Sequence, residues 1–501
     1  MHVGRWRRGL WAALLGGLLL AGCGTTVVNP VTGRQERTVM DEAAEVAEGR
    51  KAHEQVLAEY GVYANPALQA YVNAVGQKLA AQSHRSQLKW TFTVLDSPEV
   101  NAFALPGGYV YITRGIMAYL DSEAELAGVI GHEIGHVTAR HGAQRATRQQ
   151  SAGLGVLAAT VLGAVLEGAG VGGATDLASQ VSQGVAAGWL ATYSRDQELQ
   201  ADQLGAEYLA RNRYNPNNMV DVIGVLKNQE RFAADLAKTE GRTPPSGANW
   251  LSSHPSNDQR LADITRIAGG YQGDYGDDGR TRYLQAIDGM AFGESRAQGV
   301  VRGRNFFHED LGVALTAPQG WGIRNSPQAI IVVNGAGDAG LAVQLVPPQA
   351  GKTHDEIIRN VVKPTEGRTA QRSIHGLAAT EFSGVRRNEQ GQSQPVRVLL
   401  VSGPEDRNYL LHRTARDAAA LQRAAAPLAE AEASFRALTA AEHMAARPWA
   451  LKTVSFPRGG FAELARSSPL PAQAESQLRL INSAYSGGGE PRPGQAVKVV
   501  R

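Results

Sequence analysis

Three histidines and one glutamate lie within ten positions of the mostly apolar segment 127–142, AGVIGHEIGHVTARHG. His132 and His136 are four residues apart, so on a helix both imidazoles project from one face and can direct ring nitrogens at an ion about 2.0–2.1 Å away. Glu133 is turned from them by about 100° and can reach a water on that ion. This HExxH pattern indicates a metal site that activates water.

The surrounding residues predict that this segment is a helix. Ser122 and Glu125 fit a capping box just before the apolar run, and Gly142 suits a C-terminal stop. Gly131 and Gly135 are small enough to let another backbone approach. Opposite the two histidines, one narrow apolar stripe is formed by Leu126, Ile130, Ile134 and Val137.

A third protein ligand must come from another part of the chain. In metzincins it lies six residues after the second histidine, with a glycine at the third, but here those places hold Gly142 and Ala139. His141 is five residues after His136 and is rotated too far around the helix to share the ion. We interpret His141 as a surface residue or as one that supports a ligand.

The segment 193–211, YSRDQELQADQLGAEYLAR, predicts a second helix on which Glu198, Asp202 and Gly205 share one face. An acid pair beside a glycine fits a ligand face that packs closely against another helix, although alone it is equally typical of a solvated acidic face. The competing acid, Glu167, lies in a Gly-rich apolar segment without such a framework. The HExxH helix therefore makes Glu198 the preferred third ligand.

Together the two helices resemble peptidase family M48, the gluzincins that include periplasmic lipoproteins with chaperone and protease activity. The second motif of that family, SRxxExxADxxG, reads here Ser194, Arg195, Glu198, Ala201, Asp202 and Gly205. The resemblance runs from about residue 27 to 270 and also covers NPVTGR, the hairpin NAFALPGGYVYITRG and SSHPSNDQRLADI.

The resemblance implies that His132, His136 and Glu198 bind one zinc ion, that Glu133 is the general base and that Asp202 is a proton donor. On physical grounds Asp202 could equally accept from a ligand imidazole N–H and fix its orientation, and we favour that role. Zinc would polarise the scissile carbonyl and lower the pKa of its water toward about 7, while Glu133 carries the proton to the leaving amine.

Two further segments are expected to serve the same site. His254, in SSHPSNDQR, is the candidate donor to the tetrahedral oxyanion, with Arg260 anchoring its loop; the alternative is a surface loop histidine. The hairpin 101–115 would offer an edge strand on which an extended substrate can pair. The apolar segment 153–174 is expected to be a mobile cover over the cleft, with membrane insertion as the alternative.

The N-terminus predicts export and lipidation. A basic stretch and the apolar run 10–21 are typical of a signal peptide over residues 1–22. Its end, Leu20-Ala21-Gly22-Cys23, resembles the lipobox of bacterial lipoproteins, and Cys23 is the only cysteine. Gly24 in place of aspartate favours, by resemblance to Gram-negative lipoproteins, the outer membrane. We expect lipidated Cys23 to be the membrane anchor and residues 23–45 to be a tether.

The chain is expected to form several domains, because it has 501 residues of which 43% are hydrophobic. Its mixture of helical and strand patterns predicts an α+β protein. A net charge of +3 and the absence of a basic run argue against a nucleic-acid partner. A mainly helical, zincin-type peptidase domain with a small β-hairpin or sheet is expected over 46–285. An accessory α+β module is expected over 300–445, ending in an Ala-rich helix over 416–445.

The last unit, residues 447–501, resembles a LysM module with the order strand, helix, helix, strand. Its Gly turn at 459 and 460, LRLIN with Asn482 and the closing PGQAVKVV carry the likeness, although the usual Gly-Asp-Thr turn reads Gly-Gly-Phe. The resemblance implies peptidoglycan as a partner, and the alternative is a purely structural cap.

Two classes of function follow from these patterns. The first is a zinc endopeptidase of the bacterial cell envelope, facing the periplasm, that hydrolyses misfolded or stalled envelope and outer-membrane polypeptides. The second is a non-enzymatic envelope lipoprotein that binds proteins or peptidoglycan and keeps a structural metal. Glu133 separates them, because a structural zinc site has no need of a general base.

Overall fold

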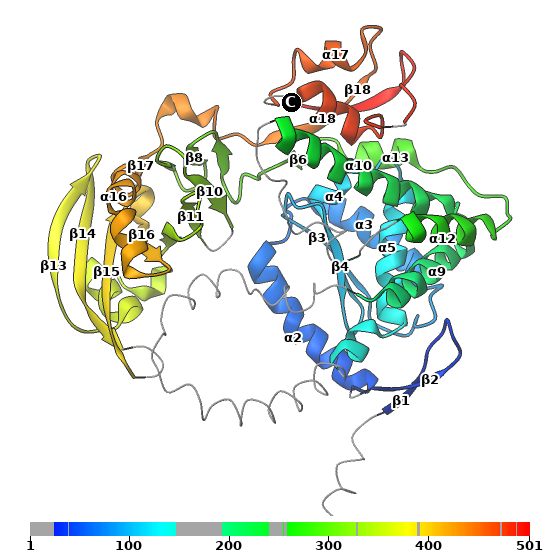
Figure 1. Ribbon diagram of the computed structural model, residues 1–501, viewed down its shortest axis with the longest axis horizontal. Helices are drawn as coiled ribbons and strands as arrows, with labels where there is room; N and C mark the ends of the chain where they lie inside the picture. The colour runs from blue at the N-terminus through cyan, green and yellow to red at the C-terminus, as the bar shows by residue number, and fades with distance from the viewer. Residues whose placement is uncertain are drawn as a thin grey trace, which may run out of the picture.

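The computed structural model describes residues 25–38, 40–146, 193–239, 254, 258–326, 329–387, 391–470, 473–486 and 488–501. The expected signal peptide with Cys23 and the expected cover over 153–174 lie outside these residues. The described chain forms an N-terminal domain, an accessory module and a C-terminal unit (Figure 1). None of the described helices combines the length and apolar character needed to cross a membrane.

The N-terminal domain packs helices on a three-stranded sheet. Its strands are β3 (Thr91–Leu95), β4 (Ala102–Leu105) and β5 (Tyr109–Thr113). Its helices are α2 (Glu42–Tyr60), α3 (Pro66–Ala80), α4 (Arg114–Tyr119), α5 (Glu123–Thr138), α9 (Arg195–Arg211), α10 (Asn217–Thr239), α12 (Asp258–Gly269) and α13 (Arg280–Ile287). These elements agree with the prediction of a mainly helical domain with a small sheet.

The predicted hairpin is confirmed and lies at a sheet edge. The strand order is β3-β5-β4, with β3 parallel and β4 antiparallel to β5. Gly107 and Gly108, in the turn, have φ of 83° and 98°, a region that residues with a Cβ avoid. Among the described strands, β4 pairs only with β5, and it contacts the HExxH helix α5.

Helix α5 begins where the sequence predicts and ends earlier. Ser122 accepts from the backbone N–H of Glu125 at 3.1 Å, but the Glu125 carboxylate accepts from the N–H of Asp121, one residue before the expected partner. The helix ends at Thr138 rather than at Gly142, because Arg140 adopts a left-handed φ of 57°. Residues 141–146 are helical again.

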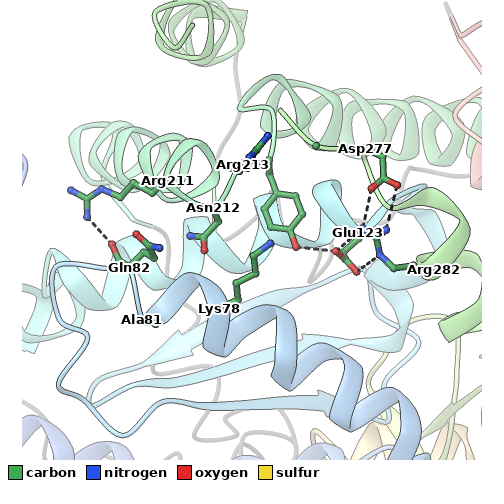
Figure 2. Close-up of a pocket in the computed structure, with 11 residues that line it drawn as sticks. Lys78, Ala81, Gln82, Glu123, Arg211, Asn212, Arg213, Asp277 and Arg282 are labelled. Atoms are coloured by element: carbon green, nitrogen blue, oxygen red, sulfur yellow. Dashed lines mark hydrogen bonds and ion pairs between the residues drawn. The ribbon is translucent and has the colours of Figure 1, made fainter. Parts of the chain in front are cut away.

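The first turn of α5 is fixed by a carboxylate at its positive end. Glu123 accepts from the hydroxyls of Tyr71 and Tyr214, at 3.0 and 2.9 Å, and from Arg282 at 3.2 Å. Figure 2 shows Arg282 between Glu123 and Asp277. A negative charge at a helix N-terminus is favourable, so these contacts hold the start of the helix that carries the histidines.

The sequence predicts that α5 buries one apolar stripe, but in the structure every residue of α5 is buried. The side away from the stripe packs against α9. A Cβ on Gly135 would lie 2.8 Å from the carbonyl oxygen of Ala201, and one on Gly205 would lie 3.1 Å from the backbone nitrogen of His132. The predicted close approach of the two helices through glycines is therefore confirmed.

Part of the segment expected as a tether is folded. Strands β1 (Thr25–Val28) and β2 (Gln35–Thr38) form an antiparallel hairpin, and α2 follows from Glu42. Asn29, in the loop of the hairpin, is only 2% exposed, and its Oδ1 accepts from the backbone N–H groups of Val31 and Thr32. The hairpin is thus a structured part of the N-terminal domain.

The accessory module is α+β, as expected. One antiparallel sheet has the order β10-β11-β12-β16-β15-β14-β13, and a smaller one has the order β17-β9-β8-β7. The strands are β7 (Val300–Arg302), β8 (Asn305–His308), β9 (Val313–Thr316), β10 (Gly322–Asn325), β11 (Ile330–Val333), β12 (Ala339–Leu345), β13 (Pro364–Ile374), β14 (Leu377–Arg387), β15 (Ser393–Ser402), β16 (Asn408–Ala415) and β17 (Arg436–Ala437). A short helix, α14 (His354–Ile357), precedes β13.

The prediction of one Ala-rich helix over 416–445 is wrong. Two short helices replace it, α15 (Ala418–Arg423) and α16 (Ala425–Ala433). Pro427 lacks the N–H that would bond to the carbonyl of Arg423, and its ring clashes with that carbonyl, so the first helix stops there. After α16 the chain turns to bury Phe435 in the core of the module.

The C-terminal unit has the predicted order of strand, helix, helix and strand. Its elements are β18 (Trp449–Ser455), α17 (Gly460–Ala465), α18 (Ala474–Ile481) and β19 (Ala496–Val500). Strand β18 pairs with β19 and with β6 (Ala291–Phe292), which follows the N-terminal domain. The likeness to LysM remains a prediction.

The C-terminal unit packs on the N-terminal domain and shares its hydrophobic core (Figure 1). Lys498 is fully buried in this interface, where its ammonium lies 3.1 Å from a carboxylate oxygen of Asp121 and donates to the carbonyl of Ala118 at 3.1 Å. Asp121 directly precedes the N-cap residue of α5. The unit therefore supports the start of the HExxH helix.

Candidate metal centre

Four buried side chains bring their donor atoms to one point. His132 and His136 come from α5, Glu198 from α9 and His254 from the segment before α12, and these atoms all lie within 4.8 Å of one another. The Nε2 atoms of His132 and His136 are 3.0 Å apart. Oε1 of Glu198 lies 3.4 Å from Nε2 of His136, and Oε2 lies 3.6 Å from Nε2 of His132.

The donor set fits a zinc ion. Ligands at about 2.0–2.1 Å in tetrahedral geometry are about 3.3 Å from one another, close to the separations observed here. Two imidazole nitrogens and a carboxylate are also the ligand types that zinc takes in hydrolytic sites. The two helices thus assemble His132, His136 and Glu198 as the sequence predicts.

The electrostatics keep these donors in the forms that bind metal. Burial lowers the pKa of His136 to about 3, so its imidazole is neutral and a ring nitrogen carries a lone pair. Burial alone would raise the pKa of Glu198, but the charges of His254 and Arg260 hold it well below its ordinary value. The carboxylate is therefore ionised, as a metal ligand must be.

Asp202 and Arg260 form a layer behind the donors. Oδ1 of Asp202 lies 2.9 Å from Nδ1 of His132, the ring nitrogen that faces away from the donor group. Arg260 donates to both carboxylate oxygens of Asp202 at 2.9 Å, and its Nη1 lies 2.7 Å from Oε2 of Glu198. This position of Asp202 fits a partner that orients a ligand imidazole.

Arg260 does more than the sequence predicted. Its Nη1 donates to the backbone carbonyl of His254 at 3.0 Å, which is the expected anchor of that loop. The same guanidinium also pairs with two carboxylates of the site, and its side chain is buried. Arg260 is on the first turn of α12, and the fold brings that turn next to Glu198 and Asp202. The sequence alone could not predict these two ion pairs.

His254 is not a surface histidine, because it is fully buried within the donor group. Its Nδ1 lies 3.1 Å from Nε2 of His132 and 3.0 Å from Oε1 of Glu198, and its Nε2 lies 3.6 Å from a carboxylate oxygen of Glu133. In this arrangement His254 can act as a fourth protein donor. The expected role in binding an oxyanion requires His254 to leave this position and open it to water.

Two neighbours of His136 complete the surroundings. His141 is fully buried and lies beside His136, so the interpretation as a surface residue is wrong and the supporting one fits. Tyr193 stacks on the His136 ring with centroids 3.9 Å apart. No sequence signal singled out Tyr193, since a tyrosine before a helix is ordinary. A small cavity of about 10 Å³ is lined by His136, Tyr193 and residues at the end of β4.

A larger cavity of about 630 Å³ lies at the opposite end of α9, where Figure 2 shows Lys78, Arg211 and Arg213 around it. Its charged lining is mixed, because Glu123 and Asp277 pair there with Arg282. None of the four donors lines this cavity. The candidate chemistry is therefore that of the buried donor group and not of this cavity.

The fold and the donor group define a candidate metal site of the HExxH type, to which a second helix contributes the carboxylate of Glu198. The model of peptidase family M48 matches residues 66–268, a range that includes all four donors. The chain belongs to this family, whose members are zinc metallopeptidases.

Curated relatives agree with this assignment. The chain is 30% identical to the beta-barrel assembly-enhancing protease of Yersinia pestis over 208 residues, which is 41% of this chain and 40% of that protein. It is 28% identical to the protein of that name from Escherichia coli (strain K12) over 252 residues, 49% of this chain and 47% of that one. The chain thus spans less than half the length of these bacterial relatives.

A eukaryotic relative is covered more fully. The mitochondrial metalloendopeptidase OMA1 of Schizosaccharomyces pombe is 30% identical over 259 residues, which is 50% of this chain and 69% of that protein. The shared part is therefore of the size of the N-terminal domain, which holds the donor group.

Proposed function

We propose that the protein is a zinc endopeptidase of the bacterial cell envelope that hydrolyses misfolded or stalled envelope proteins, including those of the outer membrane. The observation that carries this proposal is the position of Glu133, directly after the donor His132 and buried within the site. A structural metal site has no use for such a carboxylate, so the non-enzymatic alternative is not favoured. The bacterial relatives are named for β-barrel assembly, which supports the envelope and its β-barrel proteins as the place of action.

Each side chain has one task in this proposal. His132, His136 and Glu198 hold zinc, which when bound polarises the scissile carbonyl and acidifies a water molecule. Glu133 accepts the proton of the attacking water and delivers it to the leaving amine. Asp202 orients His132 through the contact to Nδ1. Once displaced from the donor group, His254 donates to the developing oxyanion.

Strand β4 is the proposed place for the substrate backbone. It lies at the edge of its sheet and contacts α5, so an extended peptide paired with it would run past the donor group. Pairing through backbone hydrogen bonds requires an extended chain and few particular side chains. Unfolded segments are therefore the favoured substrates.

Metal removal tests the proposed function. The purified protein should cleave an unfolded outer-membrane β-barrel polypeptide, a chelator such as 1,10-phenanthroline should abolish the cleavage, and one equivalent of zinc should restore it. Peptide products are measured by mass spectrometry, with the same polypeptide folded in detergent as the resistant control. Cleavage at an undiminished rate by the metal-free protein would contradict the proposal.

Lipidation of Cys23 is the proposed membrane anchor. Cys23→Ser should move the protein from the membrane into the soluble periplasmic fraction, because the described part of the mature chain holds no helix able to span a membrane. Gly24→Asp is the matched control, which should stay membrane-bound and shift toward the inner membrane. Fractionation and immunoblotting measure both; a Cys23→Ser protein that sediments with membranes after a salt wash would point to insertion of segment 153–174.

The C-terminal unit has peptidoglycan as its proposed partner, and the support is the resemblance of residues 447–501 to LysM. The burial of Lys498 against Ala118 and Asp121 favours the alternative, a structural cap on the N-terminal domain. We propose that the two roles are compatible, because Lys498 lies on the face of the unit that contacts the N-terminal domain, and the other faces remain for a partner.

A further inference from the structure

The second ring nitrogen of the metal ligand His136 has an unusual partner. Its Nδ1 lies 2.8 Å from Nδ1 of His141, and both rings are buried. In the same site, Nδ1 of His132 faces the carboxylate of Asp202 instead. The two ligand imidazoles are therefore supported by different chemistry, one by an anion and the other by a second imidazole.

Metal binding fixes the protons along this contact. A ligand imidazole needs its lone pair on the nitrogen that faces the metal, so His136, with Nε2 toward the donors, must carry its proton on Nδ1. That N–H donates to Nδ1 of His141, which must then be the acceptor. The proton of neutral His141 is consequently on its Nε2, which lies 3.2 Å from Oε1 of Gln200 and donates to it.

The next two residues confirm the direction of these bonds. Oε1 of Gln200 also accepts from Nδ2 of Asn29, at 2.9 Å. The amide of Asn29 cannot be reversed, because its Oδ1 already accepts from the backbone N–H groups of Val31 and Thr32. Nδ2 of Asn29 must therefore point at Gln200, and the atom of Gln200 that receives it must be the oxygen.

We propose that His141, Gln200 and Asn29 are positioning residues that hold the tautomer and ring orientation of His136 for zinc. This inference rests on the proposed function and adds to it a connection between the N-terminal hairpin and the metal ligand. Asn29 belongs to the motif NPVTGR, which the family resemblance singled out without giving it a task. Its side chain is buried in the loop of the hairpin formed by β1 and β2, 171 positions before Gln200 in the chain.

The hairpin itself is held by further bonds to the same region. Glu36, on β2, accepts from Nδ2 of Asn29 at 2.9 Å and also from the amide of Gln144. Oε1 of Gln144 in turn accepts from Gln197 on α9 at 2.8 Å. The hairpin thus joins the segment after α5 to the start of α9, the two elements that carry His141 and Gln200.

Zinc affinity of the full-length protein tests the proposal. His141→Leu keeps a similar volume without an acceptor and should weaken zinc by roughly 10- to 100-fold, as loss of a ligand's hydrogen-bond partner does. His141→Gln supplies a carbonyl oxygen to the same N–H and should restore most of that loss. Asn29→Ala removes the bond to Gln200 together with the bonds of Asn29 within the hairpin, and it should weaken zinc by roughly 2- to 10-fold because it acts at the far end of the chain of contacts. Competition with a chromophoric chelator measures all three dissociation constants.

A second readout is independent of activity. In nitrogen-15 spectra of the zinc-loaded protein with labelled histidine, the Nδ1–H of His136 should exchange slowly with water, and exchange should accelerate in His141→Leu. Thr32→Ala is the matched control on the hairpin, because it removes only a local bond to the backbone of Arg34, and it should leave zinc affinity unchanged.

The outcomes distinguish this proposal from the proposed function. If wild-type protein binds no zinc, the proposed function fails together with this inference. If the wild type binds zinc and folded His141→Leu binds it equally well, only the positioning role is overturned. Equal weakening in His141→Leu and His141→Gln would also overturn it, because a lost hydrogen-bond acceptor would then not be the cause.

Discussion

Glu133→Gln should retain zinc and the native fold while its turnover of an unfolded polypeptide falls by about 10²- to 10⁴-fold or more. The amide has the size of the carboxylate but cannot take a proton from water. Glu133 is fully buried and is not one of the four donors, and glutamine keeps its volume beside His254, so we expect the four donors to remain in place. Single-turnover cleavage measured at saturating enzyme separates this chemical defect from any change in substrate binding.

Glu125→Gln is the matched control for this experiment. Glu125 is a buried carboxyl on the same helix, and burial together with the charge of Asp121 raises its pKa to about 8. It is therefore mostly protonated near neutral pH, and glutamine can still accept from the N–H of Asp121. We expect little change in turnover. Undiminished cleavage by Glu133→Gln, or equal loss in both variants, would contradict the assignment of the base.

Glu133→Gln also serves to find substrates. A variant that binds polypeptides without hydrolysing them should retain envelope proteins during purification, and mass spectrometry can identify them. Wild-type protein treated in parallel is the control, because it releases its products. Retained proteins that are all cytoplasmic would speak against the proposed place of action.

The meeting of His132, His136 and Glu198 could be predicted because its geometry is local, whereas the place of His254 among them could not. The spacing of four between His132 and His136 fixes their common face once the helix is known, and the same argument places Glu198 and Asp202 on one face of a second helix. The small glycines on both helices indicate that the two faces can approach closely, and Gly135 does lie against Ala201. The pairing of the two helices needed no knowledge of the rest of the fold.

The surroundings of His136 could not be predicted, since they depend on where a helix ends. Gly142 was the natural stop by sequence, yet the chain turns at Arg140, whose left-handed φ has no signal in its side chain. That turn directs His141 back toward His136. A single continued helix would have carried it away.

Contacts between segments that are far apart in the chain could not be predicted from the sequence either. Nothing in the sequence near Asn29 or Lys498 indicates that the first is hydrogen-bonded to Gln200 or that the second is buried beside Asp121. Both residues are polar and were expected in a tether and in a separate module. A polar side chain is buried only where distant groups satisfy its hydrogen bonds, and those groups come from the tertiary fold.

Glu198→Gln should lower zinc affinity by more than about 100-fold, which exceeds the 10- to 100-fold typical for loss of a partner behind a ligand. Glutamine keeps the volume of this buried side chain and its contact with Arg260, so the fold is retained where alanine would leave a cavity. What it loses is the negative charge, and a neutral amide is a poor ligand for zinc. The zinc affinity of Asp202→Asn should fall by only about 10- to 100-fold, because Asp202 contacts Nδ1 of His132 and is not one of the four donors.

The control for this comparison lies on the same helix. Glu207→Gln removes a carboxylate from α9 that pairs with Arg211 at the far end from the donors, and it should bind zinc as the wild type does. Competition titration against a chelator gives all three dissociation constants, and circular dichroism of the metal-free proteins shows whether each is folded. A folded Glu198→Gln protein with wild-type affinity would remove Glu198 from the ligand set. If instead Asp202→Asn lost more zinc than Glu198→Gln, the two carboxylates would exchange roles, because the larger loss marks the group that touches the metal.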